Sequence, residues 1–209
     1  MPKVAYSEEE RAKIRDLLVR SALKLIAKQG VQNTTVQQIY DSVGISRTFF
    51  YSFFPSKEDL IVETLYMQQP KIIAYAKSLS EDKSLSWREA VCKFLFSCCY
   101  GEKNGIAVLS LQEQQIIFRR LSSESYRTFR QKQMRLFGGI LECFGIRPTP
   151  ERTALFINLA LSMMVLRKAF PETMPLLVPE AADATTRYQI SSIADCLEKM
   201  KNADSAEKK

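Results

Sequence analysis

Residues 34–57 read TTVQQIYDSVGISRTFFYSFFPSK and decide the fold of the N-terminal part of the chain. Apolar residues recur every three or four positions over residues 36–43, a spacing typical of a short amphipathic helix. Gly44 can adopt the left-handed backbone conformation that ends such a helix, and Pro55 cannot continue a second one. The stretch therefore predicts two short helices joined by a tight turn.

Both predicted helices begin with capping residues. The hydroxyl of Thr35 can accept a hydrogen bond from the amide of Gln38, whose side chain can return one to Thr35, which forms a capping box. Ser46 is a preferred N-cap residue for the second helix, which would begin at Arg47. A helix-turn-helix uses the start of its second helix to reach base edges in the DNA major groove. The stretch therefore predicts double-stranded DNA as a partner.

The side chains around the second helix suit that partner. Arg47 offers forked donors to guanine or phosphate, Thr48 offers a hydroxyl and a methyl group, and Phe49 offers an apolar edge to a thymine methyl. Tyr51 and Lys57 are better placed to contact phosphate. Such contacts set register and orientation but carry little sequence information.

Residues 11–65 resemble the N-terminal DNA-binding domain of the tetracycline-repressor (TetR) family of one-component bacterial regulators. The positions that carry the resemblance, all at the family's spacing, are Gly30, Thr34, Thr35, Ile39, Gly44, Ile45, Ser46, Tyr51, Phe53, Phe54, Ser56, Lys57, Glu58, Asp59 and Leu60. The resemblance implies DNA contacts by Thr35, Arg47, Thr48, Phe49, Tyr51, Ser52 and Lys57. Thr48, Phe49 and Ser52 differ from the family's usual residues, so the operator sequence cannot be borrowed from a relative.

Almost every other segment has a helical period, and strand patterns are absent. We therefore predict an all-α chain of about nine helices. The predicted parts are a three-helix helix-turn-helix domain at residues 1–55, a helical-bundle ligand-binding and dimerisation domain at 56–200, and a disordered tail at 201–209. Within the second domain, helices are predicted at residues 106–111, at residues 113–144 and from Thr186 onwards.

The helix predicted to start after Thr149 is unusually apolar. From Ala154 to Leu166 only Asn158 and Ser162 interrupt the hydrophobic residues, so the helix needs cover on nearly all sides. A partner subunit is the simplest second cover, and the family resemblance implies an intersubunit bundle of the last two helices. We predict a homodimer whose interface includes Leu161, Val165, Ile190, Ile193 and Leu197.

The second domain lacks the residue constellations of an enzyme. The chain has no histidine, and we find no nucleophile elbow, phosphate loop or metal-ligand cluster. We predict a non-enzyme without cofactor or metal that binds a small-molecule effector between its helices. The polar residues that could line such a pocket are Tyr100, Arg119, Tyr126, Asn158 and Ser162. In the basic stretch from Arg119 to Arg135, one arginine could turn inward to pair with an anionic ligand.

Charge and cysteine content add limits to these predictions. The chain carries a net charge of +7, of which residues 1–60 contribute +2, so the motif rather than the charge supports DNA binding.

No apolar run reaches the roughly 18 residues of a membrane span and no signal peptide is visible, so we predict a cytoplasmic protein without membrane contact. The five cysteines are expected to be reduced thiols, with a redox switch at Cys98 and Cys99 as the alternative.

Together these features predict a DNA-binding transcriptional regulator. Its predicted form is a homodimeric repressor that binds a palindromic operator and is released by an effector in the C-terminal domain. Two alternatives stay open: a helical interaction protein whose N-terminal motif is only packing, and a regulator of the same family controlled by a protein partner. Salt-dependent binding to the DNA upstream of the chain's own gene would separate the first alternative from a regulator.

Overall fold

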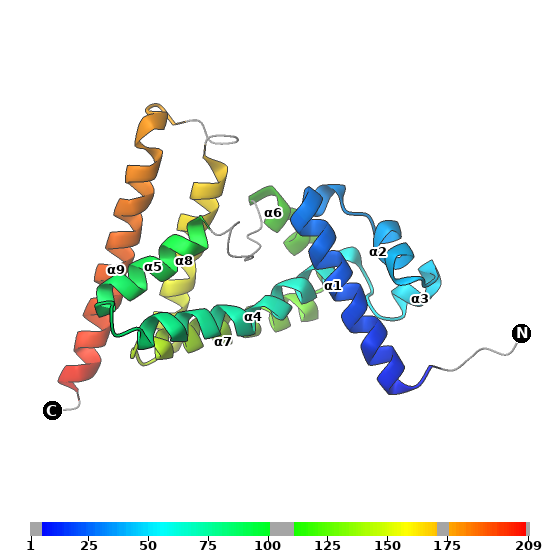
Figure 1. Ribbon diagram of the computed structural model, residues 1–209, viewed down its shortest axis with the longest axis horizontal. Coiled ribbons are helices and arrows are strands. Elements are labelled where there is room, and N and C mark those ends of the chain that lie inside the picture. Colours follow the sequence, from blue (N-terminus) through cyan, green and yellow to red (C-terminus); the bar gives the residue numbers. More distant parts are fainter. Residues whose placement is uncertain (1–5, 101–110, 171–175, 208–209) are drawn as a thin grey trace, which may run out of the picture. The chain divides into compact units, whose positions relative to one another are not determined.

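The computed structural model describes residues 6–100, 111–170 and 176–207. Helices are the only regular elements in these ranges (Figure 1), which confirms the all-α prediction. The elements are α1 (Glu8–Asn33), α2 (Val36–Val43), α3 (Arg47–Tyr51), α4 (Lys57–Glu81), α5 (Trp87–Cys99), α6 (Leu111–Arg120), α7 (Ser123–Cys143), α8 (Pro150–Ala169), the 3-10 turn η2 (Pro179–Ala181) and α9 (Ala182–Ala206). Among the described helices, none has the length and apolar character that crossing a membrane requires.

The chain divides into two compact units, of which the first comprises Met1–Met67 and Gln115–Tyr126. This N-terminal unit therefore contains the start of α4 and most of α6 in addition to residues 1–55. Its fully buried side chains come from α1, α2, α3, α4 and α6, and they include Leu18, Ala22, Ile39, Phe50, Leu60 and Ile117. Burial of these side chains supplies the hydrophobic free energy that holds the short helices α2 and α3 in place.

The single helix predicted at residues 113–144 is wrong, because α6 and α7 are separate helices. Ser122 lies between them, and its hydroxyl accepts a hydrogen bond from the amide of Ser125 at 3.0 Å. This bond satisfies one of the amides that a helix leaves free at its start, so Ser122 begins α7 as an N-cap. The helix predicted at residues 106–111 lies outside the described ranges up to residue 110.

The second unit comprises Gln68–Gln114 and Arg127–Lys209. Within it, α5 and α8 both pack against α9 (Figure 1). The core between them is built from aromatic and aliphatic side chains of α5, α7, α8 and α9, among them Phe94, Leu95, Ile140, Leu141, Phe156, Ala160, Met163, Ala194 and Leu197. Among the described residues, one face of α8 that includes Leu155, Asn158 and Ser162 is exposed.

Polar contacts show that α5 runs antiparallel to α9. Arg88 near the start of α5 pairs with Asp195 at 2.6 Å, in the second half of α9. At the other end, the hydroxyl of Tyr100 donates a hydrogen bond to Asp183 at 2.8 Å, in the first turn of α9. The two helices are therefore joined at both ends of their seam.

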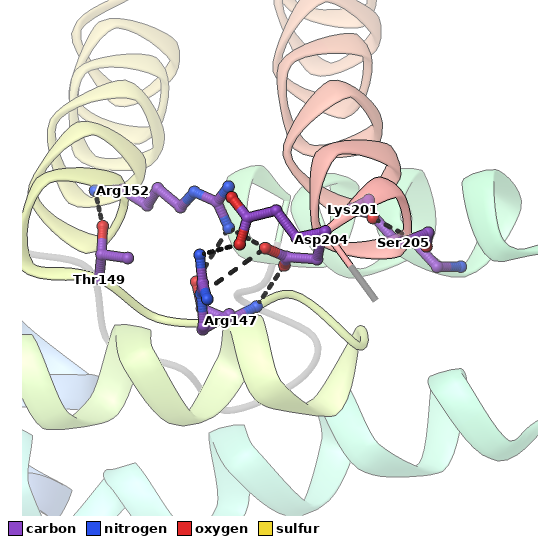
Figure 2. A network of polar contacts seen from close by, with 7 residues as sticks. Arg147, Thr149, Arg152, Lys201, Asp204 and Ser205 are labelled. Atoms are coloured by element: carbon purple, nitrogen blue, oxygen red, sulfur yellow. Dashed lines mark hydrogen bonds and ion pairs between the residues drawn. The ribbon is translucent and has the colours of Figure 1, made fainter. Parts of the chain in front are cut away.

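The C-terminal end of α9 is fastened through Asp204, as Figure 2 shows. The Asp204 carboxylate accepts hydrogen bonds from the backbone amide of Arg147 at 2.7 Å and from the guanidinium of Arg152 at 2.5 Å. The guanidinium of Arg147 also pairs with Glu207 at 2.7 Å. These contacts, and first of all the backbone hydrogen bond, hold the pKa of Asp204 below its ordinary value.

Two predictions about the last helix are wrong. The helix begins at Ala182 rather than at Thr186, because the turn η2 at Pro179–Ala181 leads directly into it. It continues to Ala206 rather than ending in a disordered tail from residue 201, because Asp204 anchors its last turns. Composition alone could not reveal that anchor, because its basic partners are far from it in the sequence. Arg147 lies in the turn between α7 and α8, and Arg152 lies in α8.

Candidate nucleic-acid interface

The predicted helix-turn-helix is present as α2, a turn at Gly44 and α3. The Thr35 hydroxyl accepts a hydrogen bond from the Gln38 amide at 3.2 Å, and the Gln38 side chain accepts one from the Thr35 amide at 2.9 Å. Gly44 has φ 75° and ψ 32°, the left-handed conformation. The amide of Ile45 bonds back to the carbonyl of Tyr40 at 3.1 Å, which closes the end of α2 as in a Schellman motif. The capping box and the turn are confirmed.

The first turn of α3 presents polar side chains to solvent. The hydroxyl of Ser46 accepts a hydrogen bond from the amide of Phe49 at 3.2 Å, so the helix begins at Arg47. Phe50 is 0% exposed and fixes the opposite face of the helix in the core. Arg47 and Thr48 are both exposed, and the first turn holds no acidic residue. The arrangement leaves a guanidinium and a hydroxyl free to approach a base edge or a phosphate.

Phe49 is partly used by the protein's own packing. Its ring stacks on Tyr6 at a centroid distance of 4.7 Å and meets the edge of Phe53 at 4.9 Å. The guanidinium of Arg11 lies 4.6 Å from the Phe53 ring centroid and 5.6 Å from that of Phe49. Tyr6 and Arg11 are thus supporting residues of α3 that the motif did not identify. No periodic pattern includes Tyr6, because it precedes α1.

Three other predicted DNA contacts differ in whether their hydroxyl groups are already bonded within the protein. Tyr51 is 42% exposed, and the guanidinium of Arg47 lies 5.9 Å from its ring centroid. Thr35 is exposed at the start of α2, with its hydroxyl engaged in the capping box. Ser52 is exposed, but its hydroxyl donates to the carbonyl of Phe49 at 2.7 Å. Tyr51 therefore offers a free hydroxyl, whereas Ser52 has an internal partner.

Lys57 occupies a different position from the one expected of a phosphate contact. Its ammonium group donates a hydrogen bond to the carbonyl of Val31 at 2.7 Å, near the end of α1. Burial lowers the pKa of Lys57 from its ordinary value. Lys57 therefore stabilises the end of α1 in the protein without DNA, and it would have to leave or share this bond to reach a phosphate.

Comparisons with known proteins agree on one family. Residues 18–64, which include α2, the turn and α3, match the sequence profile described as bacterial regulatory proteins, tetR family. A stretch of 49 residues is 45% identical to YuxN, an uncharacterized HTH-type transcriptional regulator of Bacillus subtilis (strain 168), and it covers 23% of this chain and 17% of YuxN. The chain thus spans less than a fifth of that curated relative.

Two solved structures share the fold over most of the chain. A TetR transcriptional regulator from Rhodococcus sp. RHA1 has a TM-score of 0.57 and 16% identity, covering 91% of this chain and 97% of its own. RolR, solved in complex with resorcinol, has a TM-score of 0.55 and 15% identity, covering 90% and 96%. Residues 18–64 carry the DNA-binding domain of the TetR family, and the two solved structures share the fold of the chain. Its curated relatives are regulators, and the prediction of a non-enzyme is confirmed.

The predicted interface residues fall into two groups. Ile190, Ile193 and Leu197 are 5%, 5% and 1% exposed, because they fill the core of a single chain. They offer a partner little surface, and their place in an interface stays a prediction. Leu161 and Val165 are half-buried on α8, and Leu161 packs in part against the core. Their contact with a second subunit stays a prediction.

The predicted ligand residues belong to both units of the chain. Arg119 and Tyr126 belong to the N-terminal unit, whereas Tyr100, Asn158 and Ser162 belong to the C-terminal unit. Asn158 and Ser162 are exposed on the outer face of α8, and the hydroxyl of Tyr100 is bonded to a carboxylate of α9. A pocket lined by these five residues stays a prediction.

The arginines of the basic stretch on α6 and α7 all face solvent. Arg120 pairs with Glu58 at 3.0 Å, and the pairing of one of these arginines with an anionic ligand stays a prediction. A less exposed arginine lies elsewhere, on α8. The side chain of Arg167 is 24% exposed, its guanidinium lies 4.7 Å from the Tyr100 ring centroid, and it pairs with Asp183 at 3.0 Å.

The cysteines of the second unit are all free thiols. Burial raises the pKa of Cys98 to about 12 and that of Cys99 to about 11. A thiol with so high a pKa forms little thiolate near neutral pH, and the thiolate is the reactive form. These pKa values argue against the redox switch at Cys98 and Cys99.

Proposed function

We propose that the chain is a homodimeric transcriptional repressor that acts in the cytoplasm and binds a palindromic operator through α3. The observation that carries the proposal is the first turn of α3, where Arg47 and Thr48 are exposed while Phe50 fixes the helix from the other side. Arg47 is the residue best suited to read a base, because its forked donors match guanine. Two helix-turn-helix units related by a two-fold axis require two half-sites in inverted orientation.

The test is a titration of the full chain into the DNA upstream of its own gene at several salt concentrations. We expect affinity to fall steeply as the salt concentration rises, because binding releases counterions from the DNA phosphates and added salt opposes that release. Arg47→Ala should cost about 1–3 kcal/mol on the preferred site and relax the preference at one base pair. Arg130→Ala removes the same charge from an exposed position of α7 and is the matched control. Equal losses in both variants would show that bulk charge, and not α3, determines binding.

The uncovered face of α8 supports the homodimer. Leu161 and Val165 are half-buried beside the exposed Asn158 and Ser162, and Leu155 is 44% exposed. Apolar side chains that stay partly exposed on a helix are typical of an interaction site. The face therefore suits a two-fold contact in which α8 of one subunit packs on α8 of the other.

Leu161→Arg tests this interface. The charge would have to be buried without a partner in the dimer, so we expect monomers with much weaker operator binding. Leu177→Arg is the control, because Leu177 is 99% exposed and the same change there should leave the assembly intact. Molecular mass from light scattering decides the outcome, and a Leu161→Arg dimer of normal affinity would overturn the assignment.

Release by a small-molecule effector completes the proposed mechanism. Glu58 and Asp59, next to Lys57 at the start of α4, are held by Arg120 at 3.0 Å and by Ser125 at 2.8 Å. A shift of α6 would therefore move the start of α4, which lies next to the helix-turn-helix in the sequence. An effector acts only to the extent that it prefers one arrangement, and its affinity must fall when operator is bound. Equal effector affinity with and without operator would exclude this mechanism.

A further inference from the structure

A groove of about 440 Å³ lies between α5 and α9 of the C-terminal unit. Its volume is within the range of small-molecule sites, about 300–1,000 Å³. The lining residues are Cys92, Lys93, Phe96, Arg187, Ile190 and Ser191. None of them was predicted as a ligand residue, because the groove exists only where two helices distant in the sequence pack together.

The groove is apolar at its base. Ile190 is 5% exposed and belongs to the core, while Phe96 is 37% exposed although it is a large aromatic side chain. The exposed ring of Phe96 stacks on Tyr100 at a centroid distance of 4.3 Å, which holds it in a defined orientation. A flat or branched apolar group placed here would remove this ring from water and gain the free energy of that burial.

The acidic residues along the seam are already engaged. Asp195 and Glu198 both pair with Arg88, at 2.6 Å and 3.4 Å. Asp183 at the other end pairs with Arg167 at 3.0 Å. None of these carboxylates lines the groove. A cationic ligand would therefore find no free negative charge in it.

The basic residues of the groove are, in contrast, available. The guanidinium of Arg187 lies 5.6 Å from the Phe96 ring centroid, and neither it nor Lys93 has an ion pair with a carboxylate in the described ranges. Lys93 is within electrostatic reach of Asp82, whose carboxylate is bonded by Ser84 at 2.6 Å and 2.9 Å. Two positive charges thus border an apolar surface without a counter-charge inside the groove.

Ser191 adds a directed hydroxyl. Its oxygen accepts a hydrogen bond from the guanidinium of Arg88 at 2.8 Å. Thr186 and Ser205 of the same helix donate their hydroxyls to carbonyls four residues earlier, a bond that is not formed by Ser191 in the described structure. The proton of Ser191 is therefore free to be donated into the groove.

We propose that this groove binds a small organic carboxylate with an apolar body, such as an aromatic acid. The carboxylate accepts hydrogen bonds from Arg187 and Lys93, with Ser191 as a further donor, and the apolar body lies on Phe96 and Ile190. This site goes beyond the proposed function, because its occupation does not depend on what the N-terminal unit contacts.

The first test is a calorimetric titration of the full chain, without DNA, using three compounds of similar shape. Benzoate should bind at least about tenfold more tightly than benzamide, and benzylamine should bind least, because only benzoate gains charge-assisted hydrogen bonds. Arg187→Gln should weaken benzoate binding about tenfold. Lys199→Gln, an exposed charge elsewhere on α9, is the control. Equal affinity for benzoate and benzamide, or an unaffected Arg187→Gln variant, overturns the proposal.

Alkylation of cysteine gives a second test that locates the ligand. Cys92 lines the groove, whereas Cys143 is a half-buried thiol at the end of α7. Saturating benzoate should slow maleimide labelling of Cys92 and leave that of Cys143 unchanged, as read by mass spectrometry. Benzoate that binds without protecting Cys92 would lie elsewhere and would overturn the proposal. Neither experiment contains DNA, so failure of the proposed DNA binding would leave both results intact.

Discussion

Replacing Gly44 by Ala tests whether the turn of the helix-turn-helix depends on backbone conformation alone. Gly44 has φ +75°, and a Cβ built there would meet no atom within 4 Å. A collision is therefore excluded, and the expected cost is that of a left-handed residue with a Cβ, about 1–2 kcal/mol. At Gly139 in α7 a Cβ would lie 3.6 Å from Ile73 Cδ1, an ordinary contact. Ala there should stabilise the helix by about 1 kcal/mol, because Gly is the poorer helix former.

Hydrogen exchange of the full-length variants separates these effects, because it reports each unit by its own peptides. For Gly44→Ala we expect protection over residues 36–51 to fall by a factor of about 5–30, the equivalent of 1–2 kcal/mol. For Gly139→Ala we expect protection in α7 to rise. Gly44→Asn is the control, since Asn tolerates the left-handed region better than Ala. Unchanged protection in Gly44→Ala, or weaker protection of α7 in Gly139→Ala, would refute the reasoning.

Three further predictions follow from single contacts. Thr35→Ala removes the capping box and should cost about 1 kcal/mol, seen as faster amide exchange in α2, whereas Thr35→Ser should retain most of it. The folded-state pKa of Asp204 lies below its ordinary value of 3.8, so its stabilisation is present at neutral pH and is lost as the pH falls through the folded-state value. Asp204→Asn should therefore have a lower melting temperature than the parent protein at pH 7, and the difference should shrink in acid. Fluorescence of Trp87, the single tryptophan of the chain, follows the melting, and a difference that does not depend on pH would contradict this. Arg11→Ala should weaken operator binding by about 1 kcal/mol through loss of its contacts with the rings of Phe49 and Phe53, and Arg11→Lys should not restore it, because an ammonium group does not stack as a guanidinium does.

The parts of the fold that were predicted correctly depend on local chemistry. The cap at Thr35 and the turn at Gly44 involve partners within a few residues, so their geometry follows from residue type and spacing. The break at Ser122 follows the same chemistry, but the apolar period continues across it and a serine can also lie inside a helix. Periodicity therefore predicted that the segment is helical and missed that it is two helices.

The candidate sites, in contrast, depend on contacts between distant segments and could not be predicted from local chemistry. A stripe such as Ile190, Ile193 and Leu197 reveals that one face of a helix is covered, but not whether its own chain or a partner covers it. The structure answers that question with α5 and α8 of the same chain. The groove at Phe96 and Arg187 was likewise invisible, because it arises from the pairing of α5 with α9. Contacts between segments far apart in the sequence decide both cases.

The support of α3 limits how its DNA specificity can be changed. Phe49 replaces the small residue that is common in the family, and the structure surrounds it with Tyr6, Arg11 and Phe53. Arg11 also reaches the carbonyl of Ser52 at 3.4 Å, so the end of α3 is held by the start of α1. Grafting residues 47–52 from a relative would remove Phe49, which would leave Tyr6 without its stacking partner and Arg11 with only the ring of Phe53. Specificity should therefore transfer only when Tyr6 and Arg11 are exchanged together with α3.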